Sequence, residues 1–487
     1  MMTRFLISCV LVLSAGFISI AGTNVTGGNH QTQANAEDSA CPKYVFYFIG
    51  DGMGFNHVLN TQLYLTDVLG SQDSLMLYKM PVMSAQRTHS FSSRVTDSAA
   101  AGTALATGHK TRNGMLGMGP DTVAVKSIAE VLFSRGWGVG LVTTDAIDDA
   151  TPGAFYTHVK NRGERLQIAK DLADSGFQFA AGSGLKKARN KKGKNTELLD
   201  YFEKKGVKVY CGPEGLHEEA DRMLVLSSDA MNAWSIGYTI DSIPGAMTLT
   251  DMTEAGIRQL MRVCPDRFFM MVEEGGIDHA AHSNDGGTIV REVLTLDKAV
   301  RVAYDFYLKH PDETLIVVTA DHETGGVSTG TNVTKYSMRL PGIAVQKISK
   351  EAFSDHIKSL GSDSRVYSWQ DMEDYMKDKL GWGNAFKPTE EQTAELHAMF
   401  DKMMSGRGLS DQKTLYATFD GFTARVFEIL NQDAGFGFAS LHHTGATVPV
   451  FALGVGAEKF SRISDNTDIP RRILSIALGI PVADVPL

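Results

Sequence analysis

A run of apolar residues from Lys43 to Ile49 constrains the fold most, because a strand with no alternating polar positions must be buried on both faces. Similar runs recur along the chain, at 139–142, 177–181, 267–272, 314–319 and 448–453. Segments with helical spacing of apolar residues lie between them, at 125–134, 166–175, 252–263 and 289–308. This alternation predicts an α/β fold, a doubly wound and mainly parallel central sheet with helices on both faces.

The alternation breaks between about 328 and 438, where the sequence becomes polar and helical, as in 369–379 and 389–404. We expect an inserted helical subdomain near the carboxyl edge of the sheet. The favoured interpretation gives this insertion no catalytic role, and the alternative makes it a cover over the site or an oligomer contact. Residues 41–487, with the insertion included, are expected to form a single domain.

The N-terminus has the pattern of a secretory signal peptide, with Arg4 before an apolar run from Phe5 to about Ala21. We assign residues 1–36 as signal peptide and polar leader, with cleavage after Ala36 or nearer Ala21. An uncleaved membrane anchor is the alternative, since the run approaches the length of a spanning helix. The assignment predicts export to the periplasm or the exterior and no membrane span in the mature chain.

Charge and cysteine content exclude two classes of protein. A net charge of −9 over 487 residues, with no long basic run, argues against a nucleic-acid-binding surface. The one basic cluster, at 186–194, is interrupted by glycine and asparagine and is interpreted as a solvated loop. Removal of the leader would keep Cys41, Cys211 and Cys264, which allow at most one disulfide, so the fold does not depend on disulfides.

Acidic and imidazole side chains follow the predicted strands, at the sheet edge where parallel sheets bind ligands. Asp51 follows the first strand between two glycines, and further sets occur at 145–151, 273–282 and 321–323. His442 and His443 are the exception, because they precede the last strand. Any one such residue is commonly a helix cap or a surface group. Five sets together indicate a metal centre, and carboxylates with imidazoles but no cysteine suit Zn²⁺ in open catalytic sites.

Ser98 stands directly before a run of small residues that ends at Gly108. On its own the position is that of an ordinary helix start. Beside a metal centre it becomes a candidate nucleophile, because the first N–H groups of the helix would bind an anion next to it.

The motifs resemble those of the alkaline phosphatase family, in the same order and over the whole mature chain apart from the insertion. They are Asp-Gly-Met-Gly at 51–54, Thr-Asp-Ser-Ala-Ala at 96–100, Asp-Ala-Thr-Pro at 149–152, Val-Glu-Glu-Gly-Gly-Ile-Asp-His-Ala-Ala-His at 272–282, Thr-Ala-Asp-His at 319–322 and His-Thr-Gly at 443–445. The resemblance implies hydrolysis of phosphate monoesters through a phosphoserine intermediate, at an alkaline pH optimum and in a homodimer.

The resemblance also implies roles for individual residues. A first zinc would be held by Asp278, His282 and His443, and a second by Asp51, Asp321 and His322, with Ser98 Oγ completing the second. Asp51 would bridge to a third ion, Mg²⁺, whose other ligands would be Asp149, Thr151 and Glu273. Arg162 would grip two phosphate oxygens with its planar guanidinium. His442 could replace His443, although His443 is the one in register with the Thr-Gly motif.

Two features of the sequence depart from the family pattern, and two rival functions stay open. His279 and Ala281 stand where relatives carry other polar or charged groups, which leaves metal preference and pH optimum undetermined. The insertion after Gly326 is larger than in minimal members of the family, so surface recognition and dimer geometry are not transferred from it. A phosphodiesterase or phosphonate hydrolase on the same scaffold is one alternative, and a metal-binding protein without turnover is the other. A sulfatase is disfavoured, because no Cys-x-Pro-x-Arg sequence is present.

Overall fold

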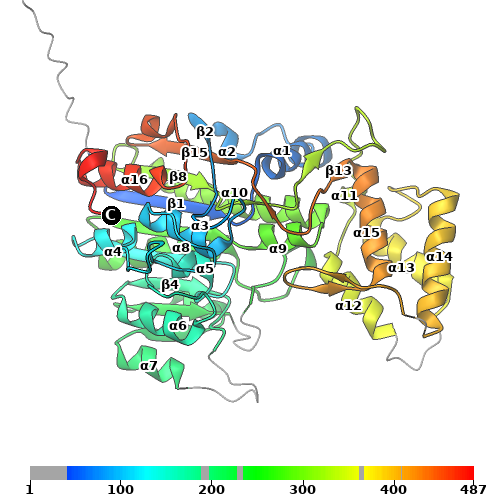
Figure 1. The fold of residues 1–487 in the computed structure, drawn as a ribbon, viewed down its shortest axis with the longest axis horizontal. Coiled ribbons are helices and arrows are strands. Elements are labelled where there is room, and N and C mark those ends of the chain that lie inside the picture. Colours follow the sequence, from blue (N-terminus) through cyan, green and yellow to red (C-terminus); the bar gives the residue numbers. More distant parts are fainter. Residues whose placement is uncertain (1–40, 188–196, 228–233, 361–366, 407) are drawn as a thin grey trace, which may run out of the picture. The chain divides into compact units, whose positions relative to one another are not determined.

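The computed structural model describes residues 41–187, 197–227, 234–360, 367–406 and 408–487. The expected signal peptide and most of the basic cluster therefore lie outside the described residues. Residues 40–487 form one compact unit. Its centre is a nine-stranded sheet in the order β2-β15-β8-β1-β7-β3-β4-β6-β5, and Figure 1 shows the helices packed around it.

The sheet confirms the α/β prediction, since its seven strands from β8 to β5 are mutually parallel. All six strands expected from apolar runs are present, as β1 (Tyr44–Gly50), β3 (Gly138–Thr143), β4 (Phe179–Gly182), β7 (Phe268–Glu274), β8 (Thr314–Thr319) and β15 (Val448–Gly454). Three were not expected, namely β2 (Val82–Gln86), β5 (Lys208–Cys211) and β6 (Met223–Leu226). β15 runs antiparallel to both β8 and β2.

Both faces of the central strand β1 are buried, as its composition requires. Val45, Tyr47 and Ile49 face one core, which includes residues of α3 (Ser98–Thr107), α4 (Ile128–Phe133), α6 (Arg165–Asp174) and α16 (Asp468–Leu478). Phe46 and Phe48 face a second core with α8 (Leu249–Val263) and α10 (Gly286–Tyr307). The period-2 alternation of a strand therefore divides one apolar run between two helical layers.

The segment from 341 to 434 forms the helices α11 (Pro341–Ala344), α12 (Lys350–Leu360), α13 (Trp369–Leu380), α14 (Glu390–Met404) and α15 (Gly421–Ala434). Four of them, α12 to α15, enclose a hydrophobic core of their own, which includes Phe353, Phe400 and Phe427. Figure 1 shows these helices grouped beside the sheet. A separate core explains why the segment interrupts the strand–helix alternation without disturbing the sheet.

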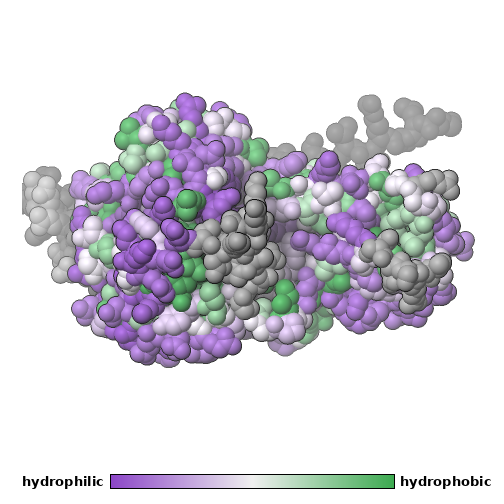
Figure 2. Space-filling view, turned by 90° about the horizontal axis from the view of Figure 1, so that it is seen from below, coloured by the Kyte–Doolittle hydropathy of each residue, from purple (hydrophilic) through white to green (hydrophobic). Residues whose placement is uncertain are grey.

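On the face seen in Figure 2, hydrophilic residues predominate and hydrophobic ones are scattered between them. No helix in the described part of the chain has the length and hydrophobicity needed to cross a bilayer.

No disulfide joins Cys41 and Cys264, two of the described cysteines.

Candidate metal and phosphate site

Strand ends bring the expected residues to one edge of the sheet. Asp51 follows β1, Glu273 lies near the end of β7, and Asp321 and His322 follow β8. His443 joins them because β15 is antiparallel, so the residues that precede it lie where the parallel strands end. A short pairing of His443 with Thr324 fixes this approach. The position of His443 before its strand is thus explained by the direction of that strand.

Asp51, Asp321 and His322 form a fully buried cluster. Their ligand atoms lie within 4.8 Å of one another, and His322 Nε2 is 3.1 Å from Asp321 Oδ2 and 3.4 Å from Asp51 Oδ1. Asp51 Oδ1 and Asp321 Oδ2 accept no hydrogen bond. Burial, together with Asp321 and Asp278, raises the pKa of Asp51 well above its usual range. Buried carboxylates with unused oxygen atoms are what a divalent cation would satisfy.

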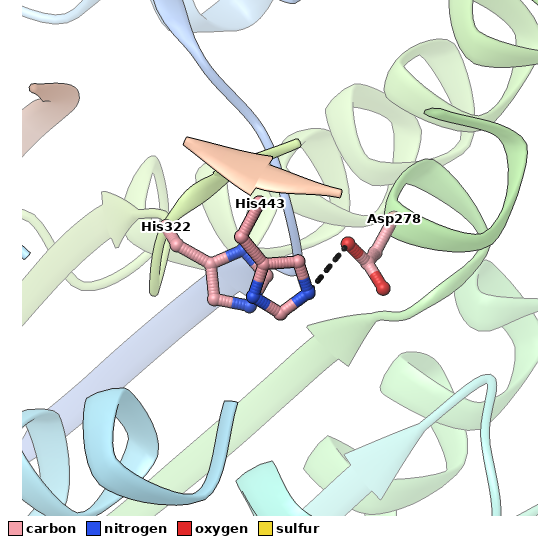
Figure 3. A group of neighbouring side chains, drawn as sticks. All are labelled: Asp278, His322 and His443. Atoms are coloured by element: carbon pink, nitrogen blue, oxygen red, sulfur yellow. Dashed lines mark ion pairs between the residues drawn. The ribbon is translucent and has the colours of Figure 1, made fainter. Parts of the chain in front are cut away.

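Asp278, His282 and His443 meet beside this first cluster. His443 Nε2 lies 3.0 Å from His282 Nε2 and 3.7 Å from Asp278 Oδ1, and His282 Nε2 is 3.4 Å from Asp278 Oδ2. Ligand atoms of Asp278, His322 and His443 also lie within 4.8 Å of one another, so His322 is close to both clusters. Figure 3 shows the rings of His322 and His443 overlapping, with Asp278 facing them. The ring centroids of His322 and His443 are 3.6 Å apart.

His282 and His443, which lie beside Asp278, are oriented for metal ligation. Nδ1 of His282 is 2.6 Å from the Leu441 carbonyl, and Nδ1 of His443 is 2.9 Å from the Thr96 carbonyl. A carbonyl partner fixes the proton on Nδ1 and leaves Nε2 as a lone-pair donor, as in most metal sites. Burial, followed by the proximity of His322, lowers the pKa of His443 to about 4, so the ring is neutral. His442 is exposed, and we retain His443 as the candidate ligand.

A glycine turn sets the distance between the clusters. Gly52 has φ of +74°, a conformation that side chains disfavour. A Cβ added there would also lie 2.9 Å from Cα of Asp278. The Gly52 N–H donates to Asp321 Oδ1 at 3.1 Å. The turn after β1 therefore lets Asp51 and Asp278 approach each other.

Ser98 lies at the first residue of α3, with its Oγ 3.2 Å from His322 Nε2. Asp97 caps this helix by accepting from the Ala100 N–H at 3.0 Å, and its other oxygen accepts from the Gly114 N–H at 2.9 Å. The serine hydroxyl thus reaches the cluster of Asp51, Asp321 and His322 while the cap holds the start of the helix.

Arg162 lies between two carboxylates beside the same helix start. Its guanidinium forms ion pairs with Asp149 at 3.2 Å and with Asp97 at 3.6 Å, and 26% of the side chain stays exposed. Although burial opposes its charge, Asp149 raises the pKa of Arg162 further above its usual range. The guanidinium is therefore held in a defined orientation with part of its surface free for an anion.

The expected ligands of the third ion differ in their surroundings. Thr151 Oγ1 is buried without a hydrogen-bond partner, and Glu273 accepts from Thr143 Oγ1 at 2.5 Å. Asp149 instead contacts three cationic side chains, Arg162, Arg165 and Lys186. Two of the ion's expected ligands are thus available, whereas the third is already neutralised.

Three further side chains at the site were not found by sequence reasoning. Tyr416, from the inserted segment, donates a hydrogen bond to Asp278 Oδ2 at 3.0 Å. Thr324 donates to the other oxygen of Asp278. Lys186, expected in a solvated loop, has only 6% of its side chain exposed, so that interpretation was wrong for this residue. Thr324 follows the Thr-Ala-Asp-His motif closely enough to have been suspected, but no sequence signal marks Tyr416 or Lys186.

Comparison with known proteins identifies the family. A family model described as alkaline phosphatase matches residues 42–190 and 183–479. The chain belongs to the alkaline phosphatase family. Phosphomonoester hydrolysis is the activity that this membership supports, and the protein is a phosphatase.

Individual alkaline phosphatases match nearly the whole chain. Alkaline phosphatase 4 of Bacillus subtilis is 29% identical over 96% of this chain and 95% of its own length. The alkaline phosphatase of Schizosaccharomyces pombe is 26% identical over 91% of this chain and 82% of its own. The solved structure of the cold-active enzyme of a psychrophilic Shewanella is 26% identical, with a TM-score of 0.74, over 89% of this chain and 99% of that one.

Proposed function

We propose that this phosphatase hydrolyses phosphate monoesters through a phosphoserine formed on Ser98, beside two zinc ions. Asp278, His282 and His443 would hold the first, and Asp51, Asp321 and His322 would hold the second. The observation that carries the proposal is the 3.2 Å approach of Ser98 Oγ to His322 Nε2. It supports the proposal because the hydroxyl of Ser98, at the helix start, lies beside His322, which is close to both ligand clusters.

The donors fit zinc on three grounds. Each cluster combines carboxylate oxygens with imidazole nitrogens and contains no cysteine, a donor set of open catalytic zinc sites. Asp51 Oδ1 and Asp321 Oδ2 are buried and accept no hydrogen bond. The Nε2 atoms of His282 and His443 are turned toward Asp278 by their carbonyl partners. When bound, two such ions would stabilise the serine alkoxide and the charge on the leaving oxygen.

The side chains then act on the phosphate in sequence. Ser98 Oγ forms a bond to phosphorus as the bond to the alcohol oxygen breaks, and the alcohol leaves with a proton. Arg162 holds non-bridging oxygens of the phosphoryl group, where negative charge must be stabilised. Water then attacks phosphorus, the Oγ–P bond breaks, and inorganic phosphate and free Ser98 result.

Trapping of the intermediate tests this proposal. Acid quenching with a ³²P-labelled monoester is expected to leave label on the Ser98 peptide of the wild type. Ser98→Ala is expected to take up no label while its zinc content stays at the wild-type level. Label on another residue, or label that persists in Ser98→Ala, would refute the assignment of the nucleophile.

Relative turnover of two ester classes separates the proposal from its closest rival. We expect kcat/KM of the zinc-loaded enzyme to be higher for an aryl phosphate monoester than for the matching diester, with an alkaline optimum. Arg162 and the positive charge around Asp149 suit a dianionic terminal phosphate. A diester rate above the monoester rate would favour the phosphodiesterase alternative.

We further propose export and a homodimer for this protein. Export rests on the apolar run at 5–21, and N-terminal sequencing of the secreted protein would locate the cleavage site. The dimer rests on family resemblance alone, and sedimentation equilibrium would test it.

A further inference from the structure

Asp149, an expected ligand of the third ion, has both of its carboxylate oxygens occupied by cations. Lys186 Nζ donates to Oδ2. Arg165 Nη2 donates to Oδ1 at 2.7 Å, and Arg162 Nη2 donates to the same oxygen at 3.2 Å. The Ala150 N–H adds a fourth donor at 2.7 Å. Although burial alone would raise the pKa of Asp149, Lys186, Arg165 and Arg162 hold it well below its usual range.

We propose that the ammonium group of Lys186 takes the place of the third divalent ion, so that this phosphatase retains two tightly bound ions per chain. This inference rests on the proposed function, because it concerns the charge balance of the same site. It replaces the Mg²⁺ that the family resemblance implies at Asp149, Thr151 and Glu273.

The parallel pairing of β3 and β4 brings Lys186 close to Asp149. Lys186 lies four residues after β4, and β4 runs parallel to β3, so their carboxyl ends share one edge. Asp148 and Asp149 lie after β3 at that same edge. The Lys186 N–H donates to the two carboxylate oxygens of Asp148 at 3.1 and 3.2 Å. One aspartate thus fixes the lysine backbone, and the next aspartate accepts its side chain.

The side chain of Lys186 is held as well as its backbone. Its ammonium lies 3.7 Å from the centroid of the Trp234 ring, within the range of a cation–π contact. Only 6% of the side chain is exposed. A surface lysine that met a carboxylate by chance would keep most of its rotamer freedom. Contacts of the Lys186 backbone with Asp148, and of its ammonium group with Asp149 and the Trp234 ring, instead hold the side chain in one conformation.

The donors that remain beside Asp149 offer a third ion little negative charge of their own. Thr151 Oγ1 is unpartnered but neutral, and the charge of Asp51 would be shared with the zinc ion held by Asp321 and His322. Glu273 would be the one carboxylate left to the ion alone. A dication beside Lys186, Arg165 and Arg162 would be repelled by three positive charges, of which the single negative charge of Asp149 offsets only part. The charge around Asp149 therefore disfavours the third ion.

Metal stoichiometry tests the inference without reference to turnover. The full-length secreted protein would be equilibrated with Zn²⁺ and millimolar Mg²⁺, desalted and analysed by mass spectrometry of its metals. We expect two zinc and no magnesium per chain for the wild type. Lys186→Met is expected to retain one additional divalent ion, and titration calorimetry with Mg²⁺ on its zinc-loaded form should show binding at least ~10-fold tighter than in the wild type.

Lys187→Met is the matched control, because it removes the neighbouring lysine and should leave the metal content at two zinc ions. One retained Mg²⁺ per chain in the wild type would overturn the inference, whatever the variants do, so the test does not depend on the folding of Lys186→Met. That result would leave phosphoserine trapping on Ser98 intact. Loss of trapping with two zinc ions present would instead refute the proposed function.

Discussion

Arg162 is the residue expected to bind the phosphate group of the substrate directly. Arg162→Ala removes charge-assisted hydrogen bonds that are worth about 1.5–3 kcal/mol, so we expect kcat/KM to fall about 10- to 100-fold. The inhibition constant of inorganic phosphate should rise in parallel. Arg162→Lys should recover little, because an ammonium cannot bind two oxygens in one plane. Arg112→Ala is a suitable control, since Arg112 is exposed and lies over Phe91. Unchanged phosphate inhibition in Arg162→Ala would exclude the clamp.

Lys350 is a buried cation whose charge the fold disfavours. Its Nζ donates to the Ser283 carbonyl and to Gln412 Oε1, both at 2.8 Å, and burial lowers its pKa to about 8 despite nearby Asp285 and Asp420. Between pH 8 and about 10.4 the unfolded chain binds more protons at this lysine than the folded chain does. The contribution of Lys350 to the free energy of unfolding should therefore rise by about 3 kcal/mol over that range.

Urea denaturation of the wild type and Lys350→Met at both ends of this pH range would measure that rise. The difference between the two proteins isolates the lysine, because other groups titrate alike in both. A difference that stays constant with pH would show that the lysine keeps its ordinary pKa in the folded state.

At the scale of elements, the small residues of α3 are explained by its contact with α5 (Ala150–Gly153). A Cβ added at Gly102 would lie 3.3 Å from Cα of Thr151. We expect Gly102→Val to lower the free energy of unfolding by about 1–3 kcal/mol, because a branched side chain must push the two helices apart. Gly102→Ala should cost less, since a single methyl is partly offset by its helix propensity. Equal stability of Gly102→Val and the wild type would contradict the close packing.

The strands that sequence could identify are those buried on both faces. β1, β7 and β8 are continuous apolar runs, and their period-2 alternation supplies two cores at once. β2 and β5 lie at the two edges of the sheet and are partly exposed, so their residues carry no such run. β6 is buried, but its apolar run covers only 223–226, whereas the run that predicted β4, a strand of the same length, extends over 177–181. Burial and length thus decided which elements were predictable.

At the scale of the whole molecule, the residues of the site come from two kinds of segment, the ends of buried strands and the loops or insertion that pack beside them. Asp51, Asp321 and His322 follow buried strands directly, and the sheet brings strand ends together in any fold of this class. Lys186 and Tyr416 come from a loop and from the inserted segment, whose course depends on tertiary packing. No local pattern in the sequence encodes that packing, which is why these two side chains escaped prediction.

Tyr416 links the inserted segment to Asp278, a proposed zinc ligand, and this link predicts an effect of the insertion on zinc retention. Its hydroxyl donates to Asp278 Oδ2 at 3.0 Å, and its ring centroid lies 4.1 Å from that of His279. A partner of this kind orients the ligand, and its loss typically weakens metal binding 10- to 100-fold. We expect Tyr416→Phe to release zinc to a chelator about 10-fold faster than the wild type. Tyr375→Phe, in the core of the same insertion, should release zinc at the wild-type rate. Equal release by Tyr416→Phe and the wild type would mean that the insertion contacts the site without supporting it.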